Sequence, residues 1–402
     1  MKHSVDPKQI LHMAERRREY STKLLAQLVE IPSISGKEEQ IIRFLERTFS
    51  QCGADEVQVD GFGNVVARLG SVGPVIAFDG HVDTVDIGQR ALWESDPYKA
   101  YMKDGRVYGR GAADQKGGLA AMITAMKILR ELSTDFPFTL FFVGSIAEEV
   151  CDGLCWQYII RESGIIPDIV VLTDPTSGTI CRGQRGRMEM EVLVDGVSCH
   201  GSAPERGDNA IYKIAPILAA VEELNRSLPA DPFLGKGTIA ATRVRSSAPS
   251  LNAVSDFAGI YLDRRLTAGE TPESAWDQVY SMDQVRRVAG RVQVISYEEP
   301  SWRGTSYPTL KSFPSWALDP GHHLLDYAQR CHKELFGAVP EINKWEFSTN
   351  GVATMGMSRI PTFGFGPGEE KMAHSPNESV LIDEVVKAAA FYAWFPWIVT
   401  GG

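Results

Sequence analysis

The sequence predicts an α/β fold, in which a mainly parallel sheet with flanking helices is interrupted by a smaller inserted α+β domain. Three short, almost continuous apolar segments alternate with helical patterns, which is typical of the buried strands of a parallel sheet. Between residues 187 and 297 the pattern changes to half-exposed strands and helices in the order of a ferredoxin-like unit. The chain of 402 residues is also too long for one ordinary core.

Composition and charge exclude several classes of protein. Hydrophobic residues make up 44% of the chain, which suits sizeable cores, and the net charge of −10 argues against a nucleic-acid partner. Residues 1–7 lack the apolar core of a signal peptide, and the apolar run 388–399 is too short to span a bilayer, so we expect no membrane partner. The six cysteines are scattered, without the spacing of a zinc knuckle. We therefore expect reduced thiols and a cytoplasmic protein.

Periodicity and turn residues define the elements of the main domain, which we expect to comprise residues 1–186 and 298–402. Ser35 to Glu38 has the pattern of a capping box, which would open the second helix. The expected helices are 7–30, 37–49, 119–132, 324–335 and 381–394, and the expected strands are 57–59, 65–69, 75–78, 138–143 and 169–172.

Polar side chains follow each of the three apolar strands. His81 and Asp83 follow the first strand, and residues i and i+2 of an extended segment point to the same side, so both can face one cavity. A histidine and a carboxylate placed in this way suit a metal ligand and its supporting group. Glu148 and Glu149 follow the second strand, and Asp174 follows the third. In open α/β sheets the ligand crevice lies beyond the carboxyl ends of the strands.

Two further residues complete a candidate metal site. Asp114 lies just before the helix at 119–132, in a glycine-rich loop that matches neither common phosphate-binding motif, and His374 follows the glycine-rich segment 364–368. A single such residue is most often a cap or a loop residue with satisfied hydrogen bonds. Two histidines with several carboxylates, however, suit Zn²⁺, with Co²⁺ or Mn²⁺ as alternatives. The candidate ligands are too many for one tetrahedral site. We therefore expect two divalent metal ions that share a bridging carboxylate.

The inserted domain is expected at residues 187–297. Its order is strand, helix, strand, strand, helix, strand, which is the split βαβ arrangement of ferredoxin-like domains. The expected strands are 188–194, 237–243, 256–262 and 292–297, and the expected helices are 210–224 and 272–282.

Five motifs, in this order along the chain, resemble those of the two-metal metallopeptidase and amidohydrolase family that includes acetylornithine deacetylase, succinyl-diaminopimelate desuccinylase and glutamate-releasing carboxypeptidases. They are Gly80–Val85, Gly109–Gly118, Glu148–Glu149, Asp174–Thr176 and Ala373–Glu378. The resemblance implies a di-metal hydrolase domain with an inserted lid and dimerisation domain, and a homodimer formed through residues 187–297.

The resemblance also implies roles for single residues. One metal would be bound by His81 and Asp174, the other by Glu149 and His374, and both by Asp114, whose peptide bond to Gln115 would be cis. Among the catalytic residues, Asp83 would orient His81, and Glu148 would be the general base. His200, in the inserted domain, would polarise the scissile carbonyl in the partner subunit's site. Substrate contacts would come from Asn252, Arg264 (with its neighbour Arg265 as the alternative) and Gly366.

We therefore expect a metal-dependent hydrolase that cleaves an amide bond of an N-acyl amino acid or small peptide-like substrate with a free carboxylate. A dipeptidase or aminopeptidase of the same family is the first alternative. A catalytically silent, metal-binding scaffold dimer is an alternative from another class. The complete ligand set and the separate base favour an enzyme.

Overall fold

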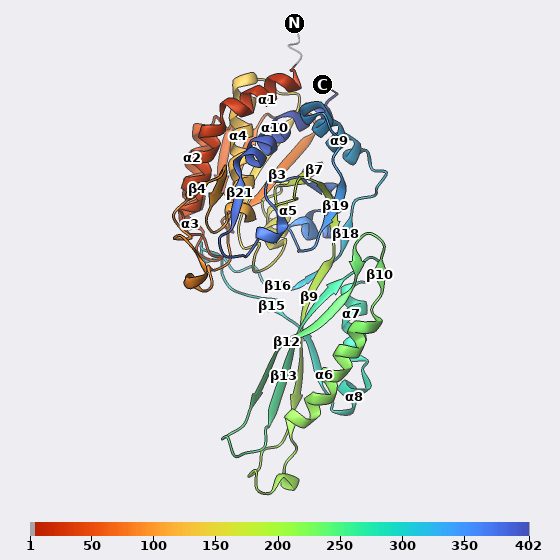
Figure 1. Cartoon of the computed structure of the whole chain (residues 1–402). Helices are drawn as coiled ribbons and strands as arrows, with labels where there is room; N and C mark the ends of the chain where they lie inside the picture. The colour runs from red at the N-terminus through yellow and green to blue at the C-terminus, as the bar shows by residue number, and fades with distance from the viewer. Residues whose placement is uncertain (1–4, 402) are drawn as a thin grey trace.

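Two separate hydrophobic cores divide the protein into two lobes (Figure 1). The core of the large lobe gathers residues from Ile10 to Cys181 and from Phe313 to Ile398, and the core of the small lobe gathers residues from Met188 to Val285. This computed structural model describes residues 5–401, so part of the segment 1–7 lies outside the described residues. The expected domain boundaries fall between the two cores, and their positions stay a prediction.

The sheet of the large lobe is parallel at its centre and antiparallel at its edges. Strand β3 pairs in parallel with β6 and β7, and β20 pairs in parallel with β7. The predicted mainly parallel α/β sheet is confirmed. In spatial order its strands are β1 (Glu56–Val59), β2 (Val65–Leu69), β6 (Thr139–Ser145), β3 (Val75–His81), β7 (Ile169–Leu172), β20 (Thr362–Gly364), β8 (Ile180–Gln184) and β18 (Trp316–Ala317), with β19 (Ile342–Trp345) on β8.

Helices cover this sheet, and the most apolar of them are central. Helix α10 is buried along most of its length because it packs against α4, α1 and α9, and its Tyr392 ring lies 5.2 Å from the Phe78 ring of β3. No helix within residues 5–401 is long and apolar enough to cross a membrane. The helices of this lobe are α1 (Pro7–Arg16), α2 (Arg18–Val29), α3 (Glu39–Gln51), α4 (Gly117–Leu132), α5 (Leu154–Arg161), α9 (His323–Phe336) and α10 (Ile382–Val399).

The small lobe has the expected split βαβ order, and its antiparallel sheet carries helices α6 and α7 along one side (Figure 1). The outer strand β12 pairs only with β13 among the described residues. Its main elements are β9 (Gly186–Asp195), α6 (Ala210–Ser227), β12 (Thr238–Ser247), β13 (Phe257–Leu266), α7 (Pro272–Tyr280), α8 (Asp283–Arg287) and β14 (Arg291–Val294), with β17 (Ser312–Phe313) on β9.

Short strand pairs complete the fold. They are β4 (Tyr101–Lys103) and β5 (Arg106–Tyr108) with β21 (Ser379–Leu381), β10 (Ala230–Asp231) with β11 (Gly235–Lys236), and β15 (Ser296–Tyr297) with β16 (Thr309–Leu310).

Two local predictions near the N-terminus were wrong. The expected helix 7–30 is two helices, because Arg17 leaves helical geometry (φ −100°, ψ 9°) between them. The expected capping box does not form: Glu38 is buried, and the Ser35 hydroxyl donates to the carboxylate of Asp83 at 2.6 Å instead. The serine is therefore used by the polar site rather than by the helix.

Candidate metal centre

The parallel register of three strands brings the predicted polar residues together. His81 of β3 stands opposite Ser145 of β6, and β3 also pairs with β7 on its other side. The carboxyl ends of these strands therefore meet at one edge of the sheet. His81 Nε2 lies 4.0 Å from Glu148 Oε2 and 3.9 Å from Asp174 Oδ1. Both acidic residues were predicted to face this edge.

Asp114 lies between the two histidines. Its Oδ1 is 3.0 Å from His81 Nε2, and its Oδ2 is 3.4 Å from His374 Nε2. The peptide bond between Asp114 and Gln115 is cis, as expected. On the far side, His374 Nε2 lies 2.9 Å from Glu149 Oε2. One carboxylate thus faces a histidine on each side, with a second carboxylate beside each histidine.

Hydrogen bonds at both ring nitrogens orient His81. Its Nδ1 lies 2.9 Å from the backbone carbonyl oxygen of Asp83, which can only accept, so Nδ1 carries the proton. Its Nε2 is then turned toward the carboxylates and lies 3.0 Å from Asp114 Oδ1. Asp83 therefore orients His81 mainly through its backbone, and its carboxylate lies farther away, at 3.7 Å.

The carboxylate of Asp83 holds the neighbouring loop instead. It accepts hydrogen bonds from the backbone N–H groups of Glu148 and Glu149, at 3.2 and 3.1 Å. Because this loop carries two consecutive acidic side chains, fixing its backbone also fixes the directions in which these two side chains point. Glu149 then reaches His374, and Glu148 reaches the side of His81.

Negative charge accumulates in this buried site. Burial raises the pKa of Glu149 and of Asp174 to about 7, and it raises the pKa of Glu148 well above its ordinary value. Hydrogen bonds with Asp114 and Glu149 raise the pKa of His374 to about 10. The ligand atoms of His81, Asp114 and Glu149 all lie within 4.8 Å of one another. Such a cluster suits divalent cations, which would offset the repulsion between the carboxylates.

Comparison with known proteins identifies the class. Residues 77–396 match the sequence model of peptidase family M20/M25/M40. The chain belongs to this family. The predicted family is therefore confirmed, and the M20 protein is an enzyme of the metal-dependent amidohydrolase class.

Relatives of this M20 protein agree with the assignment. The uncharacterized protein YgeY of Escherichia coli K12 is 44% identical over 395 residues, which are 98% of each chain. A succinyl-diaminopimelate desuccinylase of Legionella pneumophila (strain Corby) is 28% identical over 265 residues, which cover 63% of this chain and 70% of that one. The YXEP protein of Bacillus subtilis, a dinuclear metal binding peptidase from the M20 family, has the same fold (TM-score 0.68, 16% identity, 96% of this chain and 99% of that chain).

Two predicted residues of the M20 lid lie far from the metal centre within one chain. His200 is in the loop between β9 and α6, at the end of the small lobe remote from the large lobe (Figure 1). Asn252 lies beside it, because its backbone oxygen accepts from Gly201 N at 2.7 Å, and both side chains are exposed. The structure therefore brings these two residues to each other but not to the metal ligands of their own chain.

Arg264 does not have the surroundings of a substrate-binding residue. Its side chain is fully buried in the small lobe, where it pairs with Glu270 and donates to Gln278 Oε1 at 3.1 Å. Successive residues of a strand point to opposite faces, so Arg265 lies on the other, half-exposed face of β13. Arg264 therefore points into the small lobe, and of the two residues that the sequence left open only Arg265 lies on the accessible face.

Gly366 is also a packing residue in this structure. It is buried, and a side-chain carbon added to it would lie 2.1 Å from the backbone oxygen of Thr173 and 2.2 Å from that of Asp174. Only glycine allows the loop after β20 to approach the end of β7 so closely. Gly366 therefore lets the Asp174 loop pack tightly, and its contact with a substrate stays a prediction.

Sequence reasoning did not anticipate that two buried residues would support the candidate ligands. Asn350 accepts from the backbone of Gly153 at 3.0 Å and donates to Asp79 at 2.8 Å, so it ties the loop after Glu149 to β3. Glu378 receives backbone hydrogen bonds from the loop of Asp114. Glu378 stood in the last quoted motif, but nothing in the sequence showed which backbone groups it would face.

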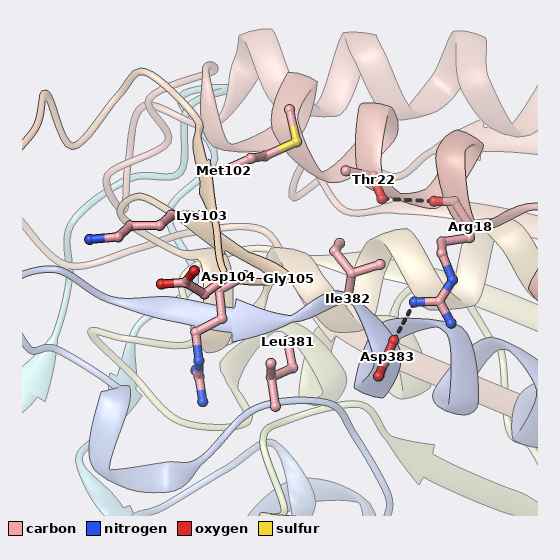
Figure 2. Close-up of a pocket in the computed structure, with 10 residues that line it drawn as sticks. Arg18, Thr22, Met102, Lys103, Asp104, Gly105, Leu381, Ile382 and Asp383 are labelled. Carbon is pink, nitrogen blue, oxygen red and sulfur yellow. Dashed lines mark hydrogen bonds and ion pairs between the residues drawn. The ribbon is translucent and has the colours of Figure 1, made fainter.

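A separate surface pocket of about 420 Å³ contains none of the predicted site residues. It lies between α2, the β4–β5 hairpin and the start of α10 (Figure 2). Arg18 and Asp383 pair with each other on its wall (Figure 2). Its charged groups are therefore partly neutralised within the protein.

Proposed function

We propose that this M20 enzyme cleaves the amide bond of an N-acyl amino acid or small peptide-like substrate with a free carboxylate, using Glu148 as the general base. The observation that carries the proposal is the buried carboxylate of Glu148, which lies beside the candidate metal ligands but forms no hydrogen bond with either histidine. Glu148 is 5% exposed, and its Oε1 has no hydrogen-bond partner. Its Oε2 lies 4.0 Å from His81 Nε2, whereas Glu149 Oε2 lies 2.9 Å from His374 Nε2. A carboxylate kept free and basic in this way suits proton transfer.

Two divalent cations fit the remaining side chains, and we propose zinc as the native metal. His81 and Asp174 would hold one ion, Glu149 and His374 the other, and Asp114 both. The buried, unpartnered Glu149 Oε1 supports this arrangement, because a buried carboxylate oxygen without a donor is costly unless a cation compensates it. Bound there, the ions would polarise the scissile carbonyl and lower the pKa of the attacking water.

The protein's own groups would then move the proton. Glu148 accepts a proton from the attacking water and passes it to the leaving amine. The Asp83 carboxylate keeps this loop in place through the Glu148 and Glu149 amides, so the base and the neighbouring ligand stay on different sides of the site. A dipeptidase or aminopeptidase would use the same groups. Turnover of a panel of N-acyl amino acids against dipeptides and tripeptides distinguishes the alternatives.

Removal of the metals tests the first part of the proposal. Dialysis against a chelator should abolish amide hydrolysis, and addition of two equivalents of Zn²⁺, Co²⁺ or Mn²⁺ should restore it, because the ligands belong to two linked sites. Metal content and initial rate are measured at each point of the titration. Full activity in the metal-free protein, or full recovery with a single tightly bound ion, would contradict a two-metal mechanism.

We propose Arg265 as the residue that binds the substrate carboxylate. It lies on the half-exposed face of β13. Burial raises the pKa of Asp152, three positions after Glu149, and the positive charges of Arg187 and Arg265 oppose this rise. In this structure its guanidinium pairs with Asp263 at 2.7 and 3.1 Å, a geometry that a second carboxylate could also use.

Substitution of Arg265 by alanine should raise KM for a carboxylate substrate about ten- to hundredfold, the effect of losing hydrogen bonds to a charged group. The methyl ester of the same substrate is the control and should respond much less. Arg264→Ala is the matched variant, and it should lower thermal stability because it leaves Glu270 buried without its partner. An equal effect of Arg265→Ala on acid and ester would rule out this role.

We also propose a homodimer formed through residues 187–297 and a cytoplasmic location. Residues 240–247 of the outer strand β12 are all exposed, which leaves a long sheet edge available for pairing. Exposed apolar side chains lie on the same lobe, namely Ile211, Tyr212, Val244 and Leu251. All six cysteines are free, as expected in a reducing compartment.

A further inference from the structure

Glu378 is surrounded by hydrogen-bond donors from the loop that carries Asp114. Its Oε1 accepts from the backbone N–H groups of Ala113 and Asp114, at 2.8 and 2.9 Å. Its Oε2 accepts from Gly111 N at 3.0 Å and from Arg110 Nη1 at 2.7 Å. The side chain is fully buried, so these four bonds replace its contacts with water.

The same residue belongs to the loop that carries His374, four positions earlier. The backbone oxygen of Glu378 accepts from Gly109 N at 2.9 Å, so the two loops are joined by main chain as well as by side chain. His374 and Asn377 both have positive φ, 59° and 57°, which is uncommon for residues other than glycine. Such a conformation persists only where the surroundings hold it, and Glu378 is part of those surroundings.

The chemistry of the surroundings requires a carboxylate at this position. All four partners are donors, and a carboxylate offers acceptors on both oxygens. Glutamine would accept on one oxygen only and would turn its own N–H groups toward the other donors. Arg110, which is 2% exposed and stacks 5.1 Å from the Trp93 ring, balances the buried negative charge.

We infer that Glu378 is a positioning residue that sets the metal affinity of the site by holding the Asp114 loop against the His374 loop. The inference rests on the proposed function in that it takes Asp114 and His374 as metal ligands. Glu378 touches neither metal nor substrate in this scheme. It fixes in advance the backbone from which the shared carboxylate projects, so binding of the ions requires little reorganisation.

The variant Glu378→Gln tests this inference by titration of chelator-treated protein with Co²⁺, followed through the visible absorption of the bound ion. The affinity for Co²⁺ should fall about ten- to hundredfold, the usual consequence of removing a group that orients metal ligands. Glu270→Gln is the matched control. Glu270 is also a buried carboxylate that pairs with an arginine and accepts from a backbone N–H, but it lies in the small lobe, away from the ligands.

Both variants should lose thermal stability, and only Glu378→Gln should lose metal affinity. If Glu378→Gln binds two Co²⁺ ions as tightly as the wild type, or if Glu270→Gln weakens binding equally, the inference is wrong. Hydrogen exchange of the metal-free wild type gives a second test that does not depend on the folding of a variant. Slow exchange across residues 111–114 supports the inference, and exchange as fast as in surface loops contradicts it.

Neither measurement uses a substrate. A protein that binds Co²⁺ as expected but hydrolyses no amide would contradict the proposed function and leave this inference intact. If the wild type hydrolyses amides and Glu378→Gln binds Co²⁺ as tightly as the wild type, the inference is wrong and the proposed function stands.

Discussion

Glu148→Gln should lower kcat for amide hydrolysis about a hundred- to ten-thousandfold, the usual contribution of a general base, with both metals still bound. Glutamine keeps the size and planar shape of the side chain but cannot accept a proton. The structure makes this separation of base and ligand possible, because Glu148 faces His81 while Glu149 faces His374. The change should therefore affect the chemical step and leave substrate binding nearly unaltered.

The matched variant is Glu149→Gln, which changes the adjacent carboxylate in the same way. It should lose metal as well as activity, because its Oε2 lies 2.9 Å from His374 and belongs to the ligand set. Metal content and kcat are measured for both variants after identical loading with Zn²⁺. A fully loaded Glu148→Gln enzyme with kcat within tenfold of the wild type would show that another group acts as the base.

The site residues at the strand ends could be predicted from the sequence because each of them follows a short apolar run. Such a run marks a buried parallel strand, and polar residues directly after it must lie at the carboxyl edge of the sheet. His81 and Asp174 were located in this way, and the structure places them 3.9 Å apart. Asp114 and His374 were included as polar residues after glycine-rich loops, but which metal each would bind was indicated only by the resemblance to a known family.

Other features depend on information that the local sequence does not contain. The strand predicted at 256–262 corresponds to β13, which continues to Leu266 and so includes both arginines. Which face of it lies inward depends on the packing of α6 and α7. Arg264 and Arg265 therefore could not be distinguished without the structure. For the same reason Ser35 was predicted as a helix cap, although its hydroxyl donates a hydrogen bond to the carboxylate of Asp83. Glu378 was missed because its partners are backbone amides more than 260 positions away.

His200→Ala should lower kcat about a hundred- to a thousandfold, the effect of losing one donor to the oxyanion of the transition state. The Ser202 amide donates to His200 Nδ1 at 3.1 Å, so the proton of the neutral ring lies on Nε2. This N–H is free to donate to a carbonyl oxygen. Because His200 lies at the remote end of the small lobe, we expect this carbonyl to belong to a substrate in the site of a partner subunit, and we expect metal content to be unchanged.

Mixed dimers test whether His200 acts across the interface. In a dimer of Glu148→Gln and His200→Ala chains, one site would combine an intact Glu148 with the intact His200 of the partner subunit. Random exchange makes about half of the dimers mixed, each with one working site, so about one quarter of the wild-type activity should return on mixing two inactive proteins.

The mixture is compared with each variant alone at the same total concentration, after dissociation and reassembly. A chain in which His200 serves its own site would recover no activity, because every site would still lack one of the two groups. A wild-type protein that is fully active as a monomer would contradict both the dimer and the role of His200 in it. Recovery of activity would also show that the assembly brings the loop of His200 to the active site of the partner subunit.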